Sequence, residues 1–545
     1  MRTLPGLLLL ASLAFFISPG ASQAAVGDLT FDSCASDDGT GGLCTDLPSA
    51  PLDDPREMAI SPDGDSVYVL GQEADGINHF TVGSDGRLTF AGCLSNSGAN
   101  GCVNLPGAPI EAPSGVAVSP DGDSVYVVSR TYSVLSHFAA SPTGSLTFAG
   151  CVSNDGVTGG SCFDLPGAPI QIPEDVTVSS DGASVYVASS ANSAVSHFAA
   201  APAGQLTFAG CVSDSGFGGC FDIPGTGTPL SNANGVAMSP DRDSVYVGAP
   251  GGVSHFFAAP AGQLTFGGCV NSNGSSGCFD VPGTPLDEAG PIVVSPDGGS
   301  VYVTARVSDS VVRFSAAPGG QITFADCVSN DGQGDVCADA PGNPLDVPNE
   351  LALSPDGTDI YVSSFFSGSV TRIAAGAPGE LAFAGCVSDN GSAGNCSDLP
   401  GILSFPTLGL AVAPNGASVY ASAIGSNADA VVRLARELPD TTPPLLTLDA
   451  RKAKAGKPVR VVVSCSEACS VDVSGSAKPK GAKRGNLLPA TTDLAAGASA
   501  TLTLKPRGKL KKSLRRAGKG KASIAATATD AAGNSADATD NVKLK

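Results

Sequence analysis

The sequence is most regular in a stretch that runs from Gly115-Val116-Ala117-Val118 through Ser119-Pro120-Asp121-Gly122 to Ser124-Val125-Tyr126-Val127-Val128. The first and last parts carry the β-branched and aromatic residues that strands favour. Between them, proline and glycine stand at positions typical of a tight turn. The stretch therefore predicts two short strands joined by a turn.

This pattern occurs seven times at a nearly constant period. The first cysteine of each copy lies at position 34, 93, 151, 211, 269, 327 or 386, so successive copies are 58 to 60 residues apart. Each copy holds four short strand signals, exemplified by residues 115–118, 124–128, 133–139 and 146–151. Self-similarity at a fixed period indicates a repeat architecture. Four strands repeated seven times predict an all-β fold, a seven-bladed β-propeller.

The two ends of the repeat region predict how such a ring closes. Leu29-Thr30-Phe31 has the fourth-strand pattern, whereas the last copy, residues 408–433, supplies only the first three strands. We therefore expect the N-terminal strand to complete the seventh blade, which would remove an open sheet edge. On this interpretation, residues 28–436 form one propeller.

The motif V-A-V-S-P-D-G-x-S-V-Y-V, from Val116 to Val127, resembles that of the YVTN-type and lactonase-like seven-bladed β-propellers. The resemblance extends over the whole repeat region. It implies the fold strongly and an activity only weakly, because propellers carry many functions. The paired cysteines are not a general feature of that superfamily, and they suggest a specialised extracellular branch.

Charge divides the chain into two parts. Residues 1–440 hold 10 arginines and 44 acidic residues, a net −34, whereas residues 441–545 hold 20 basic and 7 acidic residues, a net +13. Such asymmetry marks a domain boundary and two surfaces with different partners. The overall charge of −21 argues against a nucleic-acid-binding protein.

The C-terminal part begins after a proline-containing linker, residues 437–444. The T-T-P-P sequence at its end and Asp530-Ala-Ala-Gly-Asn534 resemble those of bacterial Ig-like modules, which implies a small β-sandwich over residues 445–545. The basic run Lys509–Lys521 is compatible with a short helix. Two interpretations stay open for this module: a spacer with a solvated basic face, or attraction to an anionic envelope polymer or to the acidic propeller.

The N-terminus has the features of an export signal. Arg2 precedes an apolar run over residues 4–17, and Ser22-Gln23-Ala24 fits a small-x-small cleavage site. Residues 1–24 are therefore predicted to be a signal peptide, and no later segment is apolar enough to span a bilayer. We expect a secreted protein, extracellular or associated with the cell envelope, and a monomer.

The sixteen cysteines fit an oxidising compartment. Their spacing favours pairing between sequence neighbours, and the absence of nearby histidines argues against zinc. Each bridge would close a loop of about ten residues and contribute roughly 2–3 kcal/mol. The expected pairs are Cys34 with Cys44, Cys93 with Cys102, Cys151 with Cys162, Cys211 with Cys220, Cys269 with Cys278, Cys327 with Cys337, Cys386 with Cys396, and Cys465 with Cys469.

Seven of these pairs lie in loops that are predicted to form a crown at one end of the propeller. Ser, Asn, Asp and Gly dominate the loop tips, as in 152–161. This composition suits stiff loop geometry, and it also suits a ligand-facing crown. Clustered oxygen ligands are what Ca²⁺ prefers, although no loop has the EF-hand pattern. No cofactor is required, and Ca²⁺ is the ion we consider.

The four histidines, His79, His137, His197 and His255, occupy one repeated strand position. In the last three repeats Arg313, Arg372 and Arg433 take that position. A catalytic base is needed once rather than four times, so we interpret these residues as packing features of the repeat.

Residues that break the repeat are better candidates for a site. Where each first strand begins, at the channel mouth, charge is concentrated in the first, third and sixth repeats, and two arginines follow second strands on the same face. A carboxylate base and a cation for a developing oxyanion are what lactone opening or cyclisation needs. Solvated rim charge is the alternative. The candidate catalytic residues are Glu57, Glu174, Glu350, Arg56, Arg130 and Arg306.

Two functions are compatible with these features. The favoured one is a secreted, non-enzymatic propeller that binds a cell-envelope polymer, an extracellular protein or a small molecule. The alternative is a lactonase-like or muconate-cyclase-like enzyme, a hydrolase or isomerase, that acts at the channel mouth. Neither the ligand nor the substrate follows from the sequence.

Overall fold

The computed structural model describes residues 25–154, 162–201, 204–223, 225, 227–258, 263–376, 380–389, 391, 395–399, 407–425 and 429–545. The chain divides into two compact units, Met1–Glu437 and Leu438–Lys545. The signal peptide predicted for residues 1–24 lies outside the described residues. Among those that are described, no helix combines the length and the apolar character needed to cross a membrane.

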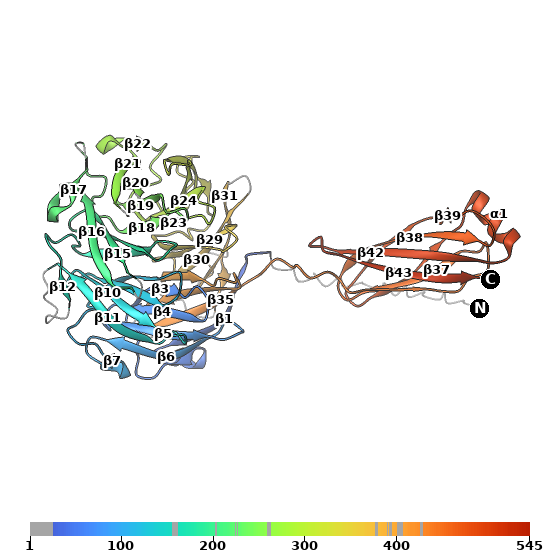
Figure 1. Cartoon of the computed structure of the whole chain (residues 1–545), viewed down its shortest axis with the longest axis horizontal. Helices are drawn as coiled ribbons and strands as arrows, with labels where there is room; N and C mark the ends of the chain where they lie inside the picture. The colour runs from blue at the N-terminus through green and yellow to red at the C-terminus, as the bar shows by residue number, and fades with distance from the viewer. Residues whose placement is uncertain are drawn as a thin grey trace, which may run out of the picture. The chain divides into compact units, whose positions relative to one another are not determined.

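In the first unit, the described residues form seven five-stranded sheets, consistent with a propeller (Figure 1). The first strands of neighbouring sheets contact one another in a cyclic order that returns from β33 to β3. These strands are β3 (Pro55–Ile60), β8 (Pro113–Val118), β13 (Pro173–Val178), β18 (Gly235–Met238), β23 (Ala289–Val294), β28 (Pro348–Leu353) and β33 (Thr407–Val412).

The second strand of each sheet is almost fully buried. These strands are β4 (Ser66–Gly71), β9 (Ser124–Ser129), β14 (Ser184–Ser189), β19 (Ser244–Ala249), β24 (Ser300–Ala305), β29 (Asp359–Ser364) and β34 (Ser418–Ala423). The third strands are β5 (Gly76–Val82), β10 (Val134–Ala140), β15 (Ala194–Ala200), β20 (Gly252–Ala258), β25 (Ser310–Ala316), β30 (Ser369–Ala375) and β35 (Ala430–Arg436).

The fourth strands are β6 (Leu88–Ser95), β11 (Leu146–Ser153), β16 (Leu206–Ser213), β21 (Leu264–Asn271), β26 (Ile322–Ser329), β31 (Leu381–Ser388) and β1 (Leu29–Ser36). In the last sheet, β1 pairs antiparallel with β35, so the N-terminal strand supplies the missing fourth strand, as the sequence predicts. Figure 1 shows the two strands side by side.

A fifth strand of only two residues extends every sheet, whereas the sequence predicts four strands. These strands are β7 (Val103–Asn104), β12 (Phe163–Asp164), β17 (Phe221–Asp222), β22 (Phe279–Asp280), β27 (Ala338–Asp339), β32 (Ser397–Asp398) and β2 (Thr45–Asp46). Each pairs in parallel with the end of a fourth strand, as β12 does with β11. Within the described ranges, short turns that contain left-handed residues precede such strands at Gly39–Gly42, Ala99–Gly101, Phe217–Gly219 and Ser275–Gly277.

The disulfides join each cysteine to its nearest neighbour in the sequence. All eight predicted pairs are confirmed, and no free thiol remains among the sixteen cysteines, all of which the structure describes. The seven bridges of the first unit are Cys34 with Cys44, Cys93 with Cys102, Cys151 with Cys162, Cys211 with Cys220, Cys269 with Cys278, Cys327 with Cys337, and Cys386 with Cys396. Cys465 with Cys469 is the bridge of the second unit.

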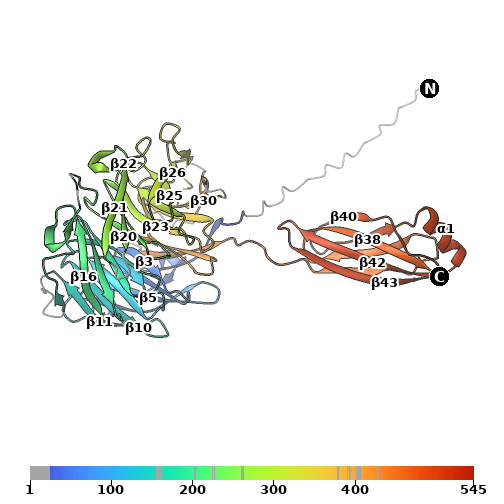
Figure 2. The ribbon, with the colours of Figure 1, turned by 45° about the horizontal axis from the view of Figure 1, so that its top comes forward.

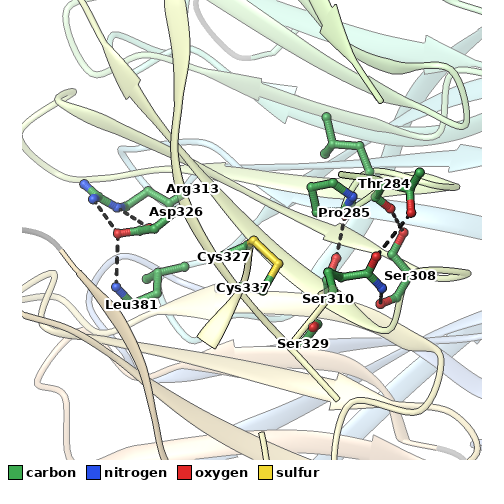
Figure 3. The surroundings of a disulfide bond; sticks show 12 residues. Thr284, Pro285, Ser308, Ser310, Arg313, Asp326, Cys327, Ser329, Cys337 and Leu381 are labelled. Atoms are coloured by element: carbon green, nitrogen blue, oxygen red, sulfur yellow. Dashed lines mark hydrogen bonds and ion pairs between the residues drawn. A yellow bond between two sulfur atoms is a disulfide. The ribbon is translucent and has the colours of Figure 1, made fainter. Parts of the chain in front are cut away.

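These bridges explain why such short fifth strands form. In the sheet of Figure 3, Cys327 lies in β26 and Cys337 directly precedes β27. The same arrangement recurs in the other sheets, where the second cysteine of each pair stands immediately before the two-residue strand. Each bridge therefore holds the fifth strand in register with the fourth.

The turn between the first and second strands is held by side chains. Ser119 Oγ donates to Asp121 Oδ1 at 2.5 Å and accepts from the backbone N–H of Ser124 at 3.0 Å. Gly122 has a φ of 77°, a left-handed conformation that glycine adopts without strain.

The apolar cores of the first unit lie between adjacent sheets. One of them, for example, combines Tyr126 and Leu135 with Val176 and Phe198 of the next sheet. Each sheet is thus stabilised by burial against its neighbours, as expected for a repeat architecture.

The second unit encloses one apolar core between two sheets. The smaller sheet has the order β36 (Leu446–Ala450), β37 (Val459–Cys465) and β41 (Ser499–Leu504). The larger one contains β39 (Gly485–Asn486), β38 (Cys469–Pro479), β42 (Gly520–Asp530) and β43 (Ser535–Leu544), with β40 (Ala490–Leu494) also paired to β38. Helix α1 (Gly508–Ala517) coincides with most of the basic run for which the sequence suggests a helix.

Candidate functional site

A cavity of about 400 Å³ lies where the first strands of the first unit begin. All six candidate residues from the sequence line it, so the sequence-based selection brings together side chains that share one space. The wall includes Arg56, Glu57, Ser114, Arg130, Glu174, Asp175, Ser190, Asn232, Asn234, Arg306, Asn349, Glu350, Phe365 and Leu408.

Glycines let the first strands approach closely around this cavity. A Cβ on Gly409 would lie 2.2 Å from the carbonyl oxygen of Arg56, and one on Gly235 would lie 2.5 Å from that of Gly290. Gly235 and Gly409 occupy the repeat position that holds a glutamate in the first and sixth sheets. Because glycine has no side chain at this position in some repeats, the carboxylates of the other repeats can share the central space.

Glu174 is fixed by two neighbours. Arg130 donates from Nε and Nη2 to Glu174 Oε2 at 2.8 and 2.5 Å, and Ser190 Oγ donates to Oε1 at 2.9 Å. Arg130 directly follows β9 and Glu174 lies in β13, so the ion pair links neighbouring sheets. The two charges neutralise each other, and Glu174 is therefore less suited to act as a base than the sequence suggests.

Glu57 and Glu350 form the distinctive feature of the cavity. They come from β3 and β28, both line the cavity, and the charge of Glu57 acts on Glu350. Burial, with the charge of Asp175, raises the pKa of Glu57 to about 8. Burial and the charges of Glu57 and Asp175 raise the pKa of Glu350 well above its ordinary value. Two buried carboxyl groups that interact this strongly do not ionise together, so the pair retains at least one proton at neutral pH.

Asp175 is a site residue that the candidate set does not contain. Its two carboxylate oxygens accept backbone N–H groups of Val176 at 2.7 Å and Val236 at 2.8 Å. Burial raises its pKa to about 6 despite these bonds. The signal was present in the sequence, because Asp175 occupies the same repeat position as Glu57 and Glu350.

The three arginines differ in their pairing. Arg56 Nε donates to Asp54 at 2.9 Å, and Arg130 is bound to Glu174. Arg306 forms no ion pair with any residue that the structure describes. Its guanidinium is therefore the cation of the wall that is available to an anionic group.

Asn234 supplies a further unused group. Its Oδ1 atom is buried and has no hydrogen-bond partner among the described residues. A buried acceptor without a partner is costly, and a ligand hydroxyl or a water molecule at the cavity wall would satisfy it. Arg306 and Asn234 thus add an anion-binding and a hydroxyl-binding group to the carboxyl pair.

The stapled loops contribute none of the wall residues named above; instead, the disulfides lie at the outer strands of the sheets. Two grooves of about 340 and 330 Å³ follow these outer strands, and each has an exposed phenylalanine at its edge, Phe221 or Phe279. Phe163 occupies the same position one repeat earlier and is 80% exposed.

The part of the chain that the structure describes contains one group of three carboxylates close enough to share a metal ion, Asp440, Glu467 and Asp530, in the second unit. The described carboxylates of the cavity form no such group. The Ca²⁺ site considered for the crown stays a prediction, because several loop tips lie outside the described residues.

Comparison with known proteins assigns the chain to no family. No family model matches the chain, and no curated protein matches it. Similar solved structures include a periplasmic gluconolactonase of Pseudomonas aeruginosa (17% identity, 61% of this chain and 85% of that chain covered, TM-score 0.44). A putative 6-phosphogluconolactonase of Bacteroides uniformis is similar at 16% identity, with 83% of this chain and 100% of that chain covered and a TM-score of 0.43. The Swd1 β-propeller domain of Myceliophteria thermophila is similar at 8% identity, with 69% of this chain and 96% of that chain covered and a TM-score of 0.45. Similarities this weak support no activity or substrate.

Proposed function

We propose that residues 28–436 form a seven-bladed β-propeller of the YVTN or lactonase-like type, closed by β1, whose central cavity is an acid–base catalytic site. The cyclic contacts of the first strands and the pairing of β1 with β35 support the closed ring. Residues 437–444 are the linker, and residues 445–545 are an Ig-like β-sandwich. The eight disulfides indicate an oxidising environment, in line with export directed by residues 1–24.

The observation that supports this proposal most strongly is the pair of buried carboxyl groups, Glu57 and Glu350, that share the wall of a polar cavity and have raised pKa values. Because the two groups do not lose their protons together, the pair supplies a carboxylic acid and, as the pH approaches 8, a carboxylate, which is the arrangement that general acid–base catalysis uses. We infer that the substrate is a small, oxygen-rich molecule, with a lactone as the leading case.

In lactone hydrolysis, each of these residues has a separate role. The carboxylate of the pair removes a proton from water as the oxygen attacks the carbonyl carbon. Arg306 stabilises the negative charge that develops on the carbonyl oxygen. The carboxylic acid of the pair then protonates the ring oxygen as its bond to the carbonyl carbon breaks, which leaves a hydroxy acid. Asn234 Oδ1 accepts a substrate hydroxyl, and the charge of Asp175 keeps the proton on the pair.

The test is a lactone-hydrolysis panel on the purified full chain between pH 5 and 9, with and without added Ca²⁺. Glu350→Gln should reduce kcat by about 100-fold or more, because it removes the acid–base partner. Asp123→Asn, the same kind of change at an exposed turn, is the matched control and should retain full turnover. Absence of turnover by the natural chain on every lactone and at every pH would contradict the proposal.

A second candidate function is a non-enzymatic, envelope-associated binding protein. The observation that favours it is the recurrence of grooves with exposed phenylalanines on successive outer strands, each stabilised by a disulfide. If this function holds, Phe221→Ala combined with Phe279→Ala should release the chain from envelope material, whereas Glu350→Gln should not.

A further inference from the structure

The fourteen lysines of the chain all lie after residue 450, and every one of them is exposed. The six arginines of this part are exposed as well. Among the described residues of the second unit, Arg451 with Asp449 is the ion pair that forms. These cations are therefore not used for packing or internal pairing, and their positive charge is presented to solvent.

Charge is sorted along the strands of the larger sheet. β38 has Asp472 near its start and Lys478 near its end. β42 runs in the opposite direction, from Lys521 to Asp530. β43 has acidic residues in its first part and Lys543 near its end. Because the strands are antiparallel, this order places the lysines at one end of the sheet, which we call the basic end.

The strand register brings lysines face to face at the basic end. Lys478 pairs with Lys521, and Lys521 pairs with Lys543. Lys480, Lys519 and Lys545 each stand two residues from these lysines in the sequence, on the side toward the basic end. The resulting lattice has spacings of about 5 Å between strands and about 7 Å along them. These six lysines line one open groove of about 440 Å³.

Like charges directly opposite each other on a sheet are destabilising. No described carboxylate forms an ion pair with these lysines to offset the repulsion. Helix α1 adds to the same charge: Leu514 is buried against the core, and Lys509, Lys511, Lys512, Arg515 and Arg516 are exposed. Repulsion between so many neighbouring lysines lowers the stability of the unit. This indicates that an anionic ligand compensates the repulsion when it binds.

The basic end lies far from the point where the chain enters the unit. Asn534, in the turn between β42 and β43, donates to the carbonyl oxygen of Asp440, and Leu445 N–H donates to Ser466 Oγ. Both contacts are at the opposite, acidic end of the strands. Within the second unit, Figures 1 and 2 show α1 and the C-terminus together at the basic end. The linker therefore does not cover the lysine lattice.

We propose that the basic end of the second unit is a binding site for an extended, phosphate-bearing polymer of the cell envelope. Lysine binds phosphate as a point charge and does not require the fixed fork geometry of arginine, so a lattice of lysines suits a chain of repeated phosphate groups. The exposed large apolar side chains of the unit are Leu438 and Leu445, both where the chain enters it. The basic end thus lacks the apolar groups that would enter a bilayer, and this favours a polymer over a lipid surface. The proposal does not depend on activity in the cavity.

The experiment uses the full chain and long-chain inorganic polyphosphate as the probe, titrated at several salt concentrations. A six-glutamine variant should bind at least about tenfold more weakly, and its binding should depend less on salt. Its substitutions are Lys478→Gln, Lys480→Gln, Lys519→Gln, Lys521→Gln, Lys543→Gln and Lys545→Gln. Replacing the same six lysines by arginine (Lys478→Arg and so on) retains the charge and should retain binding. Arg242→Gln, an exposed cation of the first unit, is the control for unspecific loss of charge.

Equal binding by the six-glutamine variant, with an unchanged thermal midpoint, would overturn the proposal. So would binding to phosphatidylglycerol vesicles that matches or exceeds binding to polyphosphate, since a lipid surface would then be the ligand. Lactone turnover by the six-glutamine variant should equal that of the natural chain, which separates a failure here from a failure of the catalytic proposal.

Discussion

Four sheets of the first unit and the remaining three differ in how one repeated position of the third strand is packed. In the sheets that contain β4, β9, β14 and β19, a histidine Nε2 lies 3.0–3.1 Å from a serine Oγ, and the imidazole stacks on a tyrosine. In the other three sheets an arginine takes the histidine position. There the neutral cluster is replaced by ion pairs such as Arg313 with Asp326 at 2.8 Å (Figure 3).

The ion pairs converge where β1 pairs with β35. Asp359 accepts from Arg372 Nε at 2.7 Å and from Arg436 Nη2 at 2.7 Å, and the Asp359 and Arg436 side chains are 2% and 1% exposed. Arg372 also contacts Asp28, and Arg433 contacts Asp32 at 2.7 Å. The neutral histidine–serine pairs and the pair of Arg313 with Asp326 each lie within one repeat. The contacts of Arg372 with Asp28 and of Arg433 with Asp32, in contrast, tie the N-terminal segment to the last two sheets.

The largest expected effect comes from breaking this network. Asp359→Asn would remove the buried carboxylate that Arg372 and Arg436 share and leave them only their more exposed partners, Asp28 and Asp356. We therefore expect the free energy of unfolding to fall by about 3–5 kcal/mol. Ser244→Ala, which removes the corresponding partner of His255 in a neutral sheet, should cost about 1 kcal/mol. Guanidinium unfolding followed by circular dichroism measures both. If both variants lost the same free energy of unfolding, the ion-pair network and the neutral cluster would contribute equally to stability, which would contradict this prediction.

Removing a disulfide should lower the free energy of unfolding by the same amount in a histidine sheet and in an arginine sheet. The bridge of Cys34 with Cys44 belongs to the sheet that contains β1, and that of Cys211 with Cys220 belongs to a histidine sheet. The paired cysteines are 10 and 9 residues apart, so replacement of either pair by serine should cost about 2–3 kcal/mol. A markedly larger loss for the first pair in the same unfolding experiment would assign the closure to the disulfide rather than to the ion pairs.

The sequence predicts much of this architecture because the repeat constrains it. The period identifies equivalent strands, the cysteine spacing identifies the disulfides, and irregular charges at the start of the first strands identify Glu57, Glu174 and Glu350 at the cavity. The fifth strand escaped detection, since two exposed residues such as Phe163-Asp164 carry no periodicity. It depends on the disulfide and on parallel pairing, which local sequence does not show.

The sequence does not reveal how the site residues pair. Glu174 binds Arg130, whereas Glu57 interacts electrostatically with Glu350, and these partners come from different sheets. The choice depends on how the sheets surround the cavity, which no local pattern encodes. The same holds for Arg372 and Arg436, which share Asp359.

The smallest effect concerns protonation of the neutral clusters. His197 is buried, its Nε2 lies 3.0 Å from Ser184 Oγ, and burial lowers its pKa from 6.5 to about 4. Between pH 6.5 and pH 4, the unfolded chain therefore binds a proton at this position that the folded chain does not. The stabilisation from the neutral imidazole is complete above pH 6.5 and is lost as the pH falls toward 4.

His197→Gln retains a hydrogen-bonding group and cannot titrate. At pH 7 we expect this variant to be less stable than the natural chain by about 1 kcal/mol, through the lost hydrogen-bond geometry and ring stacking. As the pH falls, the natural chain loses stability because its folded state keeps His197 neutral, whereas the variant has no histidine to titrate at this position. The difference in the free energy of unfolding between the two should therefore shrink and then reverse. The variant with serine at Cys211 and Cys220 retains every histidine in the same sheet, and its pH dependence should parallel that of the natural chain. A constant difference between His197→Gln and the natural chain from pH 7 to pH 4 would mean that His197 becomes protonated in the folded state, in which case the neutral clusters would resemble the charged ones.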